Sequence, residues 1–205
     1  MGSGPVRSDV SSRRGGGGAG DPDRVVPPSV TVGLARGRIA KFRSEATIGA
    51  VRLKVGDPLP SVEGKTHEGT SWKSAGSRGH PLVVYFYPRD FTSGCTREAC
   101  DFRDAYQDLS KAHEVEIIGI SRDSVETHAR FRAEHRLPFA LVSDQGGSIS
   151  KAFGVERFWG LLPFVKRVTF VADSAGVLRG IFHHEAAIAR HLEEVRACLD
   201  SLRKG

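Results

Sequence analysis

The chain has 205 residues, of which 39% are hydrophobic and 26% charged, a composition typical of one soluble globular domain with residues to spare. Its three cysteines are too few and too unevenly placed for the disulfide framework of a small secreted protein, and no stretch approaches the roughly 18 apolar residues of a membrane helix. The N-terminus lacks the apolar region of a secretory signal, so we expect a cytoplasmic protein with no membrane partner.

The formal net charge of +6 could indicate nucleic-acid binding, so the position of the excess matters. Residues 1–50 hold eight of the 30 Lys and Arg but only four of the 24 Asp and Glu, whereas the rest of the chain is nearly balanced. The excess therefore lies in a Gly-rich head and not on a folded basic face with interleaved aromatic residues. We expect no nucleic-acid partner.

Residues 1–50 are predicted to be a disordered Gly/Arg-rich N-terminal extension. They include two arginines followed by four glycines at 13–18, and they hold too few apolar side chains to offset the entropy of ordering. An arginine-rich transit peptide would fit the basic residues, but the acidic residues count against it. The folded domain is predicted over residues 51–205.

Within that domain, strands and helices alternate. Residues 61–63 and 70–72 flank a His-Glu-Gly turn, which predicts a small hairpin. Residues 81–87 (PLVVYFY) form a continuous β-branched and aromatic run, typical of a buried strand. Pro88 ends this strand, and an amphipathic helix is predicted over residues 94–112.

The later elements continue the alternation. They are a buried strand at 115–120, a helix capped by Ser124 and ending at His135, a strand at 139–142, a short helix at 149–153, an antiparallel pair at 168–172 and 177–182, and a closing helix at 186–202. This order predicts an α/β three-layer domain with a central mixed sheet flanked by helices. A thioredoxin-like arrangement fits, although the order alone does not separate it from other small α/β folds.

The segment between the first long strand and the first long helix carries the chemistry. Cys95 falls in the first turn of the predicted helix, where backbone N–H groups point outward and the macrodipole is positive. Both effects favour the thiolate, which is the nucleophilic form of cysteine. Arg89 and Arg97 could add to this effect, although either could be an ordinary surface charge.

Cys100 follows Cys95 by five residues. In an intact α-helix such residues lie roughly 8–9 Å apart between Cα atoms, whereas a disulfide needs Cα atoms within about 7 Å. A disulfide between them therefore requires the first turns to unwind, and Ser93 and Gly94 make that end of the helix weak. We predict a folded reduced form and a locally unfolded oxidised form.

Other interpretations of the cysteines are open at this point. Cys95 and Cys100 could be small buried core residues, as cysteines often are. A zinc site is disfavoured because no second close Cys/His pair appears, and His183 and His184 would face opposite sides of a strand. The C-x₂-C motif of a thioredoxin-type reductase is absent. Cys198, in the last helix, is interpreted as an inert thiol.

Several motifs resemble those of the peroxiredoxins. The pattern P-x-x-x-T-x-x-C, ending at Cys95, matches their active-site motif. YFYP at 85–88 and GCT-x-EAC-x-FRD at 94–104 resemble the bacterioferritin comigratory protein (Q-type) branch, in which the resolving cysteine lies five residues after the peroxidatic one. The similarity extends from about residue 53 to the C-terminus. Many relatives have proline where this chain has Ser93. We expect the serine to loosen the loop slightly and alter the rate, but not to remove activity.

The resemblance implies a thiol-dependent peroxidase and gives its residues roles. Cys95 would be the peroxidatic nucleophile that becomes a sulfenic acid, and Cys100 would close an intramolecular disulfide with it. The Thr92 hydroxyl would hydrogen-bond to the thiolate and the peroxide, and Pro88 would shield the sulfur from water. Arg167 would stabilise the thiolate and polarise the O–O bond.

Each of these assignments has a purely structural alternative. Pro88 could only end the strand, and Thr92 could only cap the helix. Arg167 could lie at the surface, with Lys166 as the alternative cation on the opposite face of a strand. The apolar segment of Trp159, Leu161, Leu162 and Pro163 is expected to pack as a loop, although it could wall the active site or contact a partner.

The resemblance also implies a hydroperoxide substrate and a reaction without metal, haem or flavin. Thioredoxin or a similar dithiol protein would reduce the disulfide, and a monomer is expected because the resolving cysteine is in the same chain. A redox-responsive sensor or binding module using the same disulfide is the main alternative function. A structural thioredoxin-like domain without a reactive thiol is the third.

Overall fold

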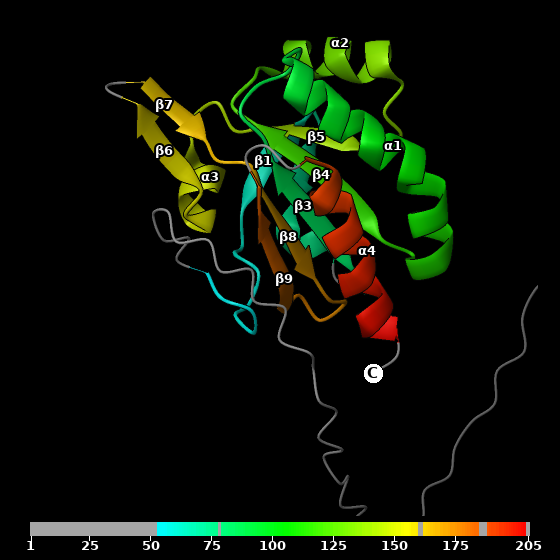
Figure 1. Cartoon of the computed structure of the whole chain (residues 1–205). Helices are drawn as coiled ribbons and strands as arrows, with labels where there is room; N and C mark the ends of the chain where they lie inside the picture. Colours follow the sequence, from blue (N-terminus) through cyan, green and yellow to red (C-terminus); the bar gives the residue numbers. More distant parts are fainter. Residues whose placement is uncertain (1–52, 78, 160–161, 185–187, 204–205) are drawn as a thin grey trace, which may run out of the picture. The chain divides into compact units, whose positions relative to one another are not determined.

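The computed structural model describes residues 53–77, 79–159, 162–184 and 188–203, so the predicted extension at 1–50 lies outside it (Figure 1). A seven-stranded mixed sheet has the order β2-β1-β5-β4-β3-β8-β9, and β6 and β7 form a separate hairpin. The strands are β1 Glu63–Thr66, β2 Ser71–Lys73, β3 Leu82–Phe86, β4 Glu116–Ser121, β5 Ala140–Ser143, β6 Glu156–Trp159, β7 Leu162–Val165, β8 Val168–Ala172 and β9 Leu178–His183. The helices are α1 Ser93–His113, α2 Val125–His135, α3 Ser148–Phe153 and α4 Ile188–Arg203, with a 3₁₀ turn at Ser74–Ser77.

Strand β3 occupies the middle of the sheet because it is apolar on both faces. All five of its residues are buried, and it pairs in parallel with β4 and antiparallel with β8. Its side chains alternate between two cores, with Val83 and Tyr85 in one and Val84 and Phe86 in the other. A strand of this kind must be covered on both sides.

Helices provide that cover. The first core lies between the sheet and the neighbouring helices α1 and α4, which contribute Phe102 and Leu199 among others (Figure 1). The second core includes Ile149 and Phe153 of α3. The predicted three-layer α/β architecture with a central mixed sheet is therefore confirmed.

Local sequence signals set several element boundaries as predicted. The Ser124 hydroxyl accepts a hydrogen bond from the backbone N–H of Thr127 at 3.2 Å and caps α2, a contact typically worth about 1 kcal/mol. Phe131, on that helix, is fully buried. The turn between β8 and β9 closes at Gly176, whose φ of 78° favours glycine.

Two segments differ from the predictions. The first hairpin strand was expected at 61–63 but lies at Glu63–Thr66, because Lys65 and Thr66 also pair with β5. The expectation that the segment around residues 159–163 packs as a loop was wrong for its described residues, since Trp159, Leu162 and Pro163 lie in the antiparallel strands β6 and β7. Pro163 obscured that strand, but a two-stranded ribbon has only edge strands, which tolerate proline. The first residues predicted for the closing helix lie outside the described ranges.

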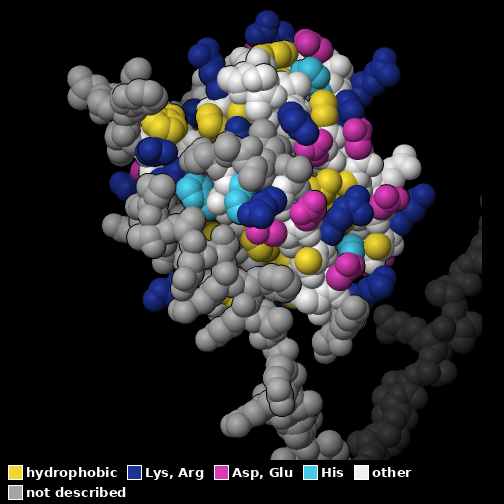
Figure 2. Space-filling view, viewed as in Figure 1, with side chains coloured by type: hydrophobic (Ala, Val, Ile, Leu, Met, Phe, Trp, Pro, Cys, Tyr) yellow, Lys and Arg dark blue, Asp and Glu magenta, His cyan; other side chains and the backbone are white. Residues whose placement is uncertain are grey.

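The described surface carries mixed charge on the face shown in Figure 2. Lys and Arg side chains lie among Asp and Glu side chains there, as on an ordinary solvent-exposed surface. Within the described ranges, no helix combines the length and apolar character needed to cross a membrane.

Candidate active site

Cys95 lies in the first turn of α1, where the helix follows the end of β3. The helix begins at Ser93, and its first turn contains no acidic residue to offset the positive end of the dipole. The thiol is 2% exposed. This is the carboxyl end of the parallel strands, the edge at which α/β folds place their sites.

Arg167 reaches this sulfur from 72 positions further along the chain. Because β8 runs antiparallel to β3 and Val168 pairs with Phe86, the residue before β8 lies beside the end of β3. The buried Arg167 side chain donates a hydrogen bond from Nη2 to the Cys95 Sγ at 3.3 Å. Lys166 is also buried, so neither of these two cations is an exposed surface charge.

Glu98 holds the other arm of the guanidinium. It lies three residues after Cys95 and therefore on the same side of α1, and it is almost fully buried. Its Oε2 accepts a hydrogen bond from Nη1 of Arg167. Burial alone would lower the pKa of Arg167, but the charges of Glu98 and Cys95 raise it above its ordinary value. The guanidinium is thus charged and fixed in orientation by two contacts.

No sequence motif assigned a role to Glu98. The available signal was an acidic residue on the apolar face of α1, between Cys95 and Phe102. A buried carboxylate requires a partner, but the sequence alone does not say that the partner is Arg167.

His191, on α4, extends the polar cluster behind Glu98. Its Nε2 lies 3.1 Å from the carbonyl oxygen of His184, which can only accept, so Nε2 carries the proton. Nδ1 therefore accepts from the Thr169 hydroxyl at 2.8 Å, and it lies 4.0 Å from Oε1 of Glu98. Burial lowers the pKa of His191 to about 4, so the ring is neutral at pH 7.

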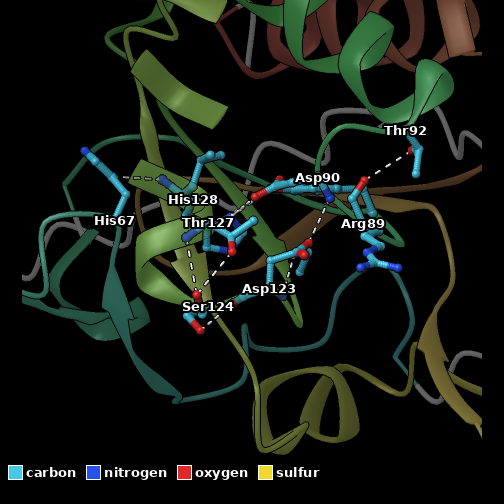
Figure 3. A network of polar contacts seen from close by, with 12 residues as sticks. His67, Arg89, Asp90, Thr92, Asp123, Ser124, Thr127 and His128 are labelled. Atoms are coloured by element: carbon cyan, nitrogen blue, oxygen red, sulfur yellow. Dashed lines mark hydrogen bonds and ion pairs between the residues drawn. The ribbon is translucent and has the colours of Figure 1, made fainter. Parts of the chain in front are cut away.

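The loop between β3 and α1 contains the other two predicted site residues. Pro88 is half-buried and follows the strand at a bend. Thr92 is the N-cap residue of α1, but its side chain makes no cap hydrogen bond. Its hydroxyl donates instead to the carbonyl oxygen of Arg89 at 3.1 Å (Figure 3). To contact the sulfur or a peroxide, the Thr92 side chain would have to leave this carbonyl.

Phe91, in the same loop, has a strained backbone. Its φ of 58° lies in the left-handed region, which costs an L-residue about 1–2 kcal/mol. The residue is 43% exposed, and its ring packs edge-on against Phe131 of α2 with centroids 5.1 Å apart. Strain of this kind persists only where neighbouring structure imposes it.

Cys100 lies further along the unbroken helix α1 and is not bonded to another cysteine. The pair therefore has the arrangement predicted for the reduced protein, in which an intact helix keeps the two sulfurs apart. Among the described side chains, no group of three His, Cys, Asp or Glu residues is placed to hold a metal ion. The site can provide a buried sulfur nucleophile and a fixed cation for charge that develops beside it.

Comparison with known proteins agrees with this arrangement. The profile of the AhpC/TSA family matches residues 55–181. The chain is 40% identical over 152 residues to the chloroplastic peroxiredoxin Q of Populus jackii. This alignment covers 74% of this chain and 70% of that protein.

Two solved structures are similar in sequence and in fold. The peroxidoxin BcpB of Mycobacterium tuberculosis superposes with a TM-score of 0.69 at 32% identity, covering 73% of this chain and 98% of that one. The bacterioferritin comigratory protein of Xanthomonas campestris, whose structures address alkyl peroxide reduction, has a TM-score of 0.65 at 30% identity and covers 71% and 99%. The predicted thioredoxin-like fold is thereby confirmed. With the family match, these likenesses show that the chain belongs to the AhpC/TSA family, in its peroxiredoxin Q and bacterioferritin comigratory protein branch, and is a thiol-dependent peroxidase.

Proposed function

We propose that Cys95 is the peroxidatic nucleophile and that Arg167 is the cation that stabilises it and polarises the peroxide. The observation that supports this assignment most directly is the hydrogen bond of 3.3 Å from Arg167 Nη2 to the Cys95 sulfur. Glu98 holds the same guanidinium and so acts as a positioning residue. Pro88 shields the sulfur, and the Thr92 hydroxyl turns from Arg89 toward the bound peroxide.

In the first step the Cys95 thiolate attacks the distal oxygen of a hydroperoxide. An S–O bond forms as the O–O bond breaks, the sulfur loses two electrons, and the leaving oxygen takes a proton to become water or an alcohol. Cys95 is left as a sulfenic acid. A guanidinium beside the reacting oxygens stabilises the negative charge that develops on the leaving oxygen.

In the second step Cys100 attacks the Cys95 sulfur. The S–S bond forms as the S–O bond breaks, and the hydroxide leaves as water with the proton of the Cys100 thiol. Because α1 is intact from Ser93 to His113 in the reduced protein, this step requires the first turns of the helix to unwind. An external dithiol then supplies two electrons and two protons by thiol–disulfide exchange and restores both thiols.

We infer that thioredoxin or a similar dithiol protein is this reductant, and that the enzyme acts as a monomer in the cytoplasm. A resolving cysteine within the same chain removes the need for a second subunit in the disulfide step. Hydrogen peroxide and organic hydroperoxides are both proposed substrates. The named activity of the Xanthomonas relative, alkyl peroxide reduction, supports the inclusion of the organic class.

The test is peptide mapping by mass spectrometry after the reduced protein has reacted with one equivalent of hydrogen peroxide. We expect a Cys95–Cys100 disulfide in the parent, a retained sulfenic acid in Cys100→Ser and no reaction in Cys95→Ser. Thioredoxin with its reductase should then restore the thiols with turnover. Slow oxidation of all three thiols alike would overturn the assignment. Stoichiometric oxidation without turnover would favour a redox sensor.

A further inference from the structure

Asp90, in the loop between β3 and α1, is more firmly held than any role proposed above requires. The side chains of Asp90 and His128 are both 0% exposed. Oδ2 of Asp90 accepts a hydrogen bond from Nδ1 of His128 at 2.7 Å, and Oδ1 accepts one from the Tyr87 hydroxyl at 2.7 Å. Both carboxylate oxygens are therefore used within the protein interior.

The backbone of Asp90 is fixed as well. Its N–H donates to Oδ2 of Asp123 at 2.8 Å, and the same oxygen accepts from the Ser121 hydroxyl at 2.7 Å. Asp123 belongs to the connection between β4 and α2, and His128 lies on α2. Figure 3 shows the dashed contacts of Asp90, with His128 on one side of it and Arg89 and Thr92 together on the other.

This clamp, defined as Asp90 with Tyr87 and His128, lies at one end of the segment that has to move. Disulfide formation unwinds the helix around Cys95, while Phe102, further along α1, is packed in the core. Unwinding also allows Phe91 to leave its left-handed conformation, and the release of that strain favours the open form. The clamp opposes this release, because it fixes the residue directly before Phe91.

We propose that the buried Asp90–His128 pair is a positioning device that sets the balance between the folded, peroxide-reactive form and the unwound, disulfide-forming form. This inference rests on the proposed roles of Cys95 and Cys100. Peroxide attack needs the folded form, in which Arg167 contacts the sulfur. Resolution needs the unwound form. A weaker clamp should therefore slow the first step and accelerate the second, because it raises the population of the open form.

The experiment measures the two steps separately in rapid-quench single turnovers with mass spectrometry. The first is the second-order rate of Cys95 oxidation in a Cys100→Ser background. The second is the first-order rate of disulfide formation with Cys100 intact. For His128→Leu we expect disulfide formation to be about tenfold faster and peroxide attack several-fold slower. Less sulfinic acid should then form at high peroxide concentration. The lifetime of the Cys95 sulfenic acid is shorter, so a second peroxide has less time to oxidise it.

Two milder variants keep the test valid if His128→Leu does not fold. Tyr87→Phe removes one hydrogen bond to Asp90 and should shift both steps in the same directions by a smaller factor. His128→Gln retains an N–H donor and should lie between the parent and the leucine variant.

His67→Gln is the matched control. The His67 side chain is also mostly buried at 8% exposed, and it accepts a hydrogen bond from the Leu141 N–H at 3.3 Å, but it belongs to the β1–β2 hairpin turn. Its replacement should lower the melting temperature without separating the two rates. Equal changes in both steps, or no change in any clamp variant, would overturn the inference. If the parent itself formed no Cys95–Cys100 disulfide, the proposed mechanism would be at fault instead.

Discussion

Cys95 and Cys198 are buried to nearly the same degree, at 2% and 1% exposed, yet their surroundings differ in kind. Cys95 lies at a helix N-terminus, with the Arg167 guanidinium 3.3 Å from its sulfur. Cys198 lies in the middle of α4 among apolar neighbours such as Val195 and Phe182. Burial raises the pKa of Cys198 to about 11, and Arg179 offsets this only in part.

This contrast shows that burial alone does not define the chemical environment of a cysteine. Both side chains are buried, but of the two only the Cys95 sulfur accepts a hydrogen bond from a guanidinium, which Glu98 holds in place. The sequence-based interpretation of Cys198 as an inert thiol is consistent with its place in the core. Peroxidase activity, thiol labelling and stability measurements can test the difference between the two sites.

The largest expected effect is the loss of peroxidase turnover in Cys95→Ser. No other described thiol has a cation held against its sulfur in this way, so no residue should replace the nucleophile. Cys198→Ala should retain full activity and serves as the matched control. Steady-state peroxide consumption with thioredoxin and its reductase measures both. Substantial turnover in Cys95→Ser would contradict the site assignment.

Replacement of Arg167 should have the next largest effect. Arg167→Gln removes the charge beside the sulfur, and we expect the rate of Cys95 oxidation to fall by about 10²–10³-fold, as for the loss of a main transition-state donor. Arg167→Lys keeps a charge but cannot hold Glu98 and the sulfur together, so it should restore only part of the rate. A competition assay for hydrogen peroxide measures the rate. Full activity in Arg167→Gln would contradict the proposed role of the Arg167 charge in peroxide reduction.

Thiol labelling should separate the two buried cysteines directly. With a pKa near 11 against an ordinary value of 9.0, Cys198 has about 100-fold less thiolate at pH 8 than an ordinary thiol. Iodoacetamide on the folded, reduced protein should therefore modify Cys95 well before Cys198, as measured by peptide mapping over time. Labelling in denaturant, where both thiols should react alike, is the control. Equal rates of modification of Cys95 and Cys198 in the folded protein would contradict the inferred difference between the two sites.

The smallest effect concerns stability and comes from His191, two turns before Cys198 on the same helix. Its folded pKa of about 4 is below the ordinary 6.5, so the unfolded chain binds more protons between these values. The free energy of unfolding should therefore fall as pH is lowered, by about 2 kcal/mol between pH 7 and pH 5 from this group.

Urea denaturation at several pH values, with His191→Gln as the comparison, measures this contribution. In the variant, the free energy of unfolding should decrease less steeply as pH is lowered, because the contribution of His191 is missing. The carboxylates should titrate alike in both proteins. Parallel stability curves for the two proteins would show that His191 does not titrate as its burial implies.

Local patterns were sufficient for most of the framework. The apolar run at 81–87 predicted a buried strand, and Ser124 predicted the start of a helix, because strand burial and helix capping depend on residues close together in the chain. The β6–β7 hairpin was missed because Pro163 masks its pattern. The extended position of β1 was missed because its pairing with β5 involves residues far away in sequence.

The candidate nucleophile could be identified from the amino-acid sequence, because the residues before and after Cys95 carry both a helix start and a recognisable motif. It also follows from the sequence that Cys100 cannot reach Cys95 across an intact helix, since five residues span a fixed length. Three features required the folded structure: the contact of Glu98 with Arg167, the hydrogen bond between Asp90 and His128, and the burial of Cys198 in the core. These outcomes depend on the antiparallel placement of β8 beside β3 and on the packing of α2 and α4, which join residues dozens of positions apart.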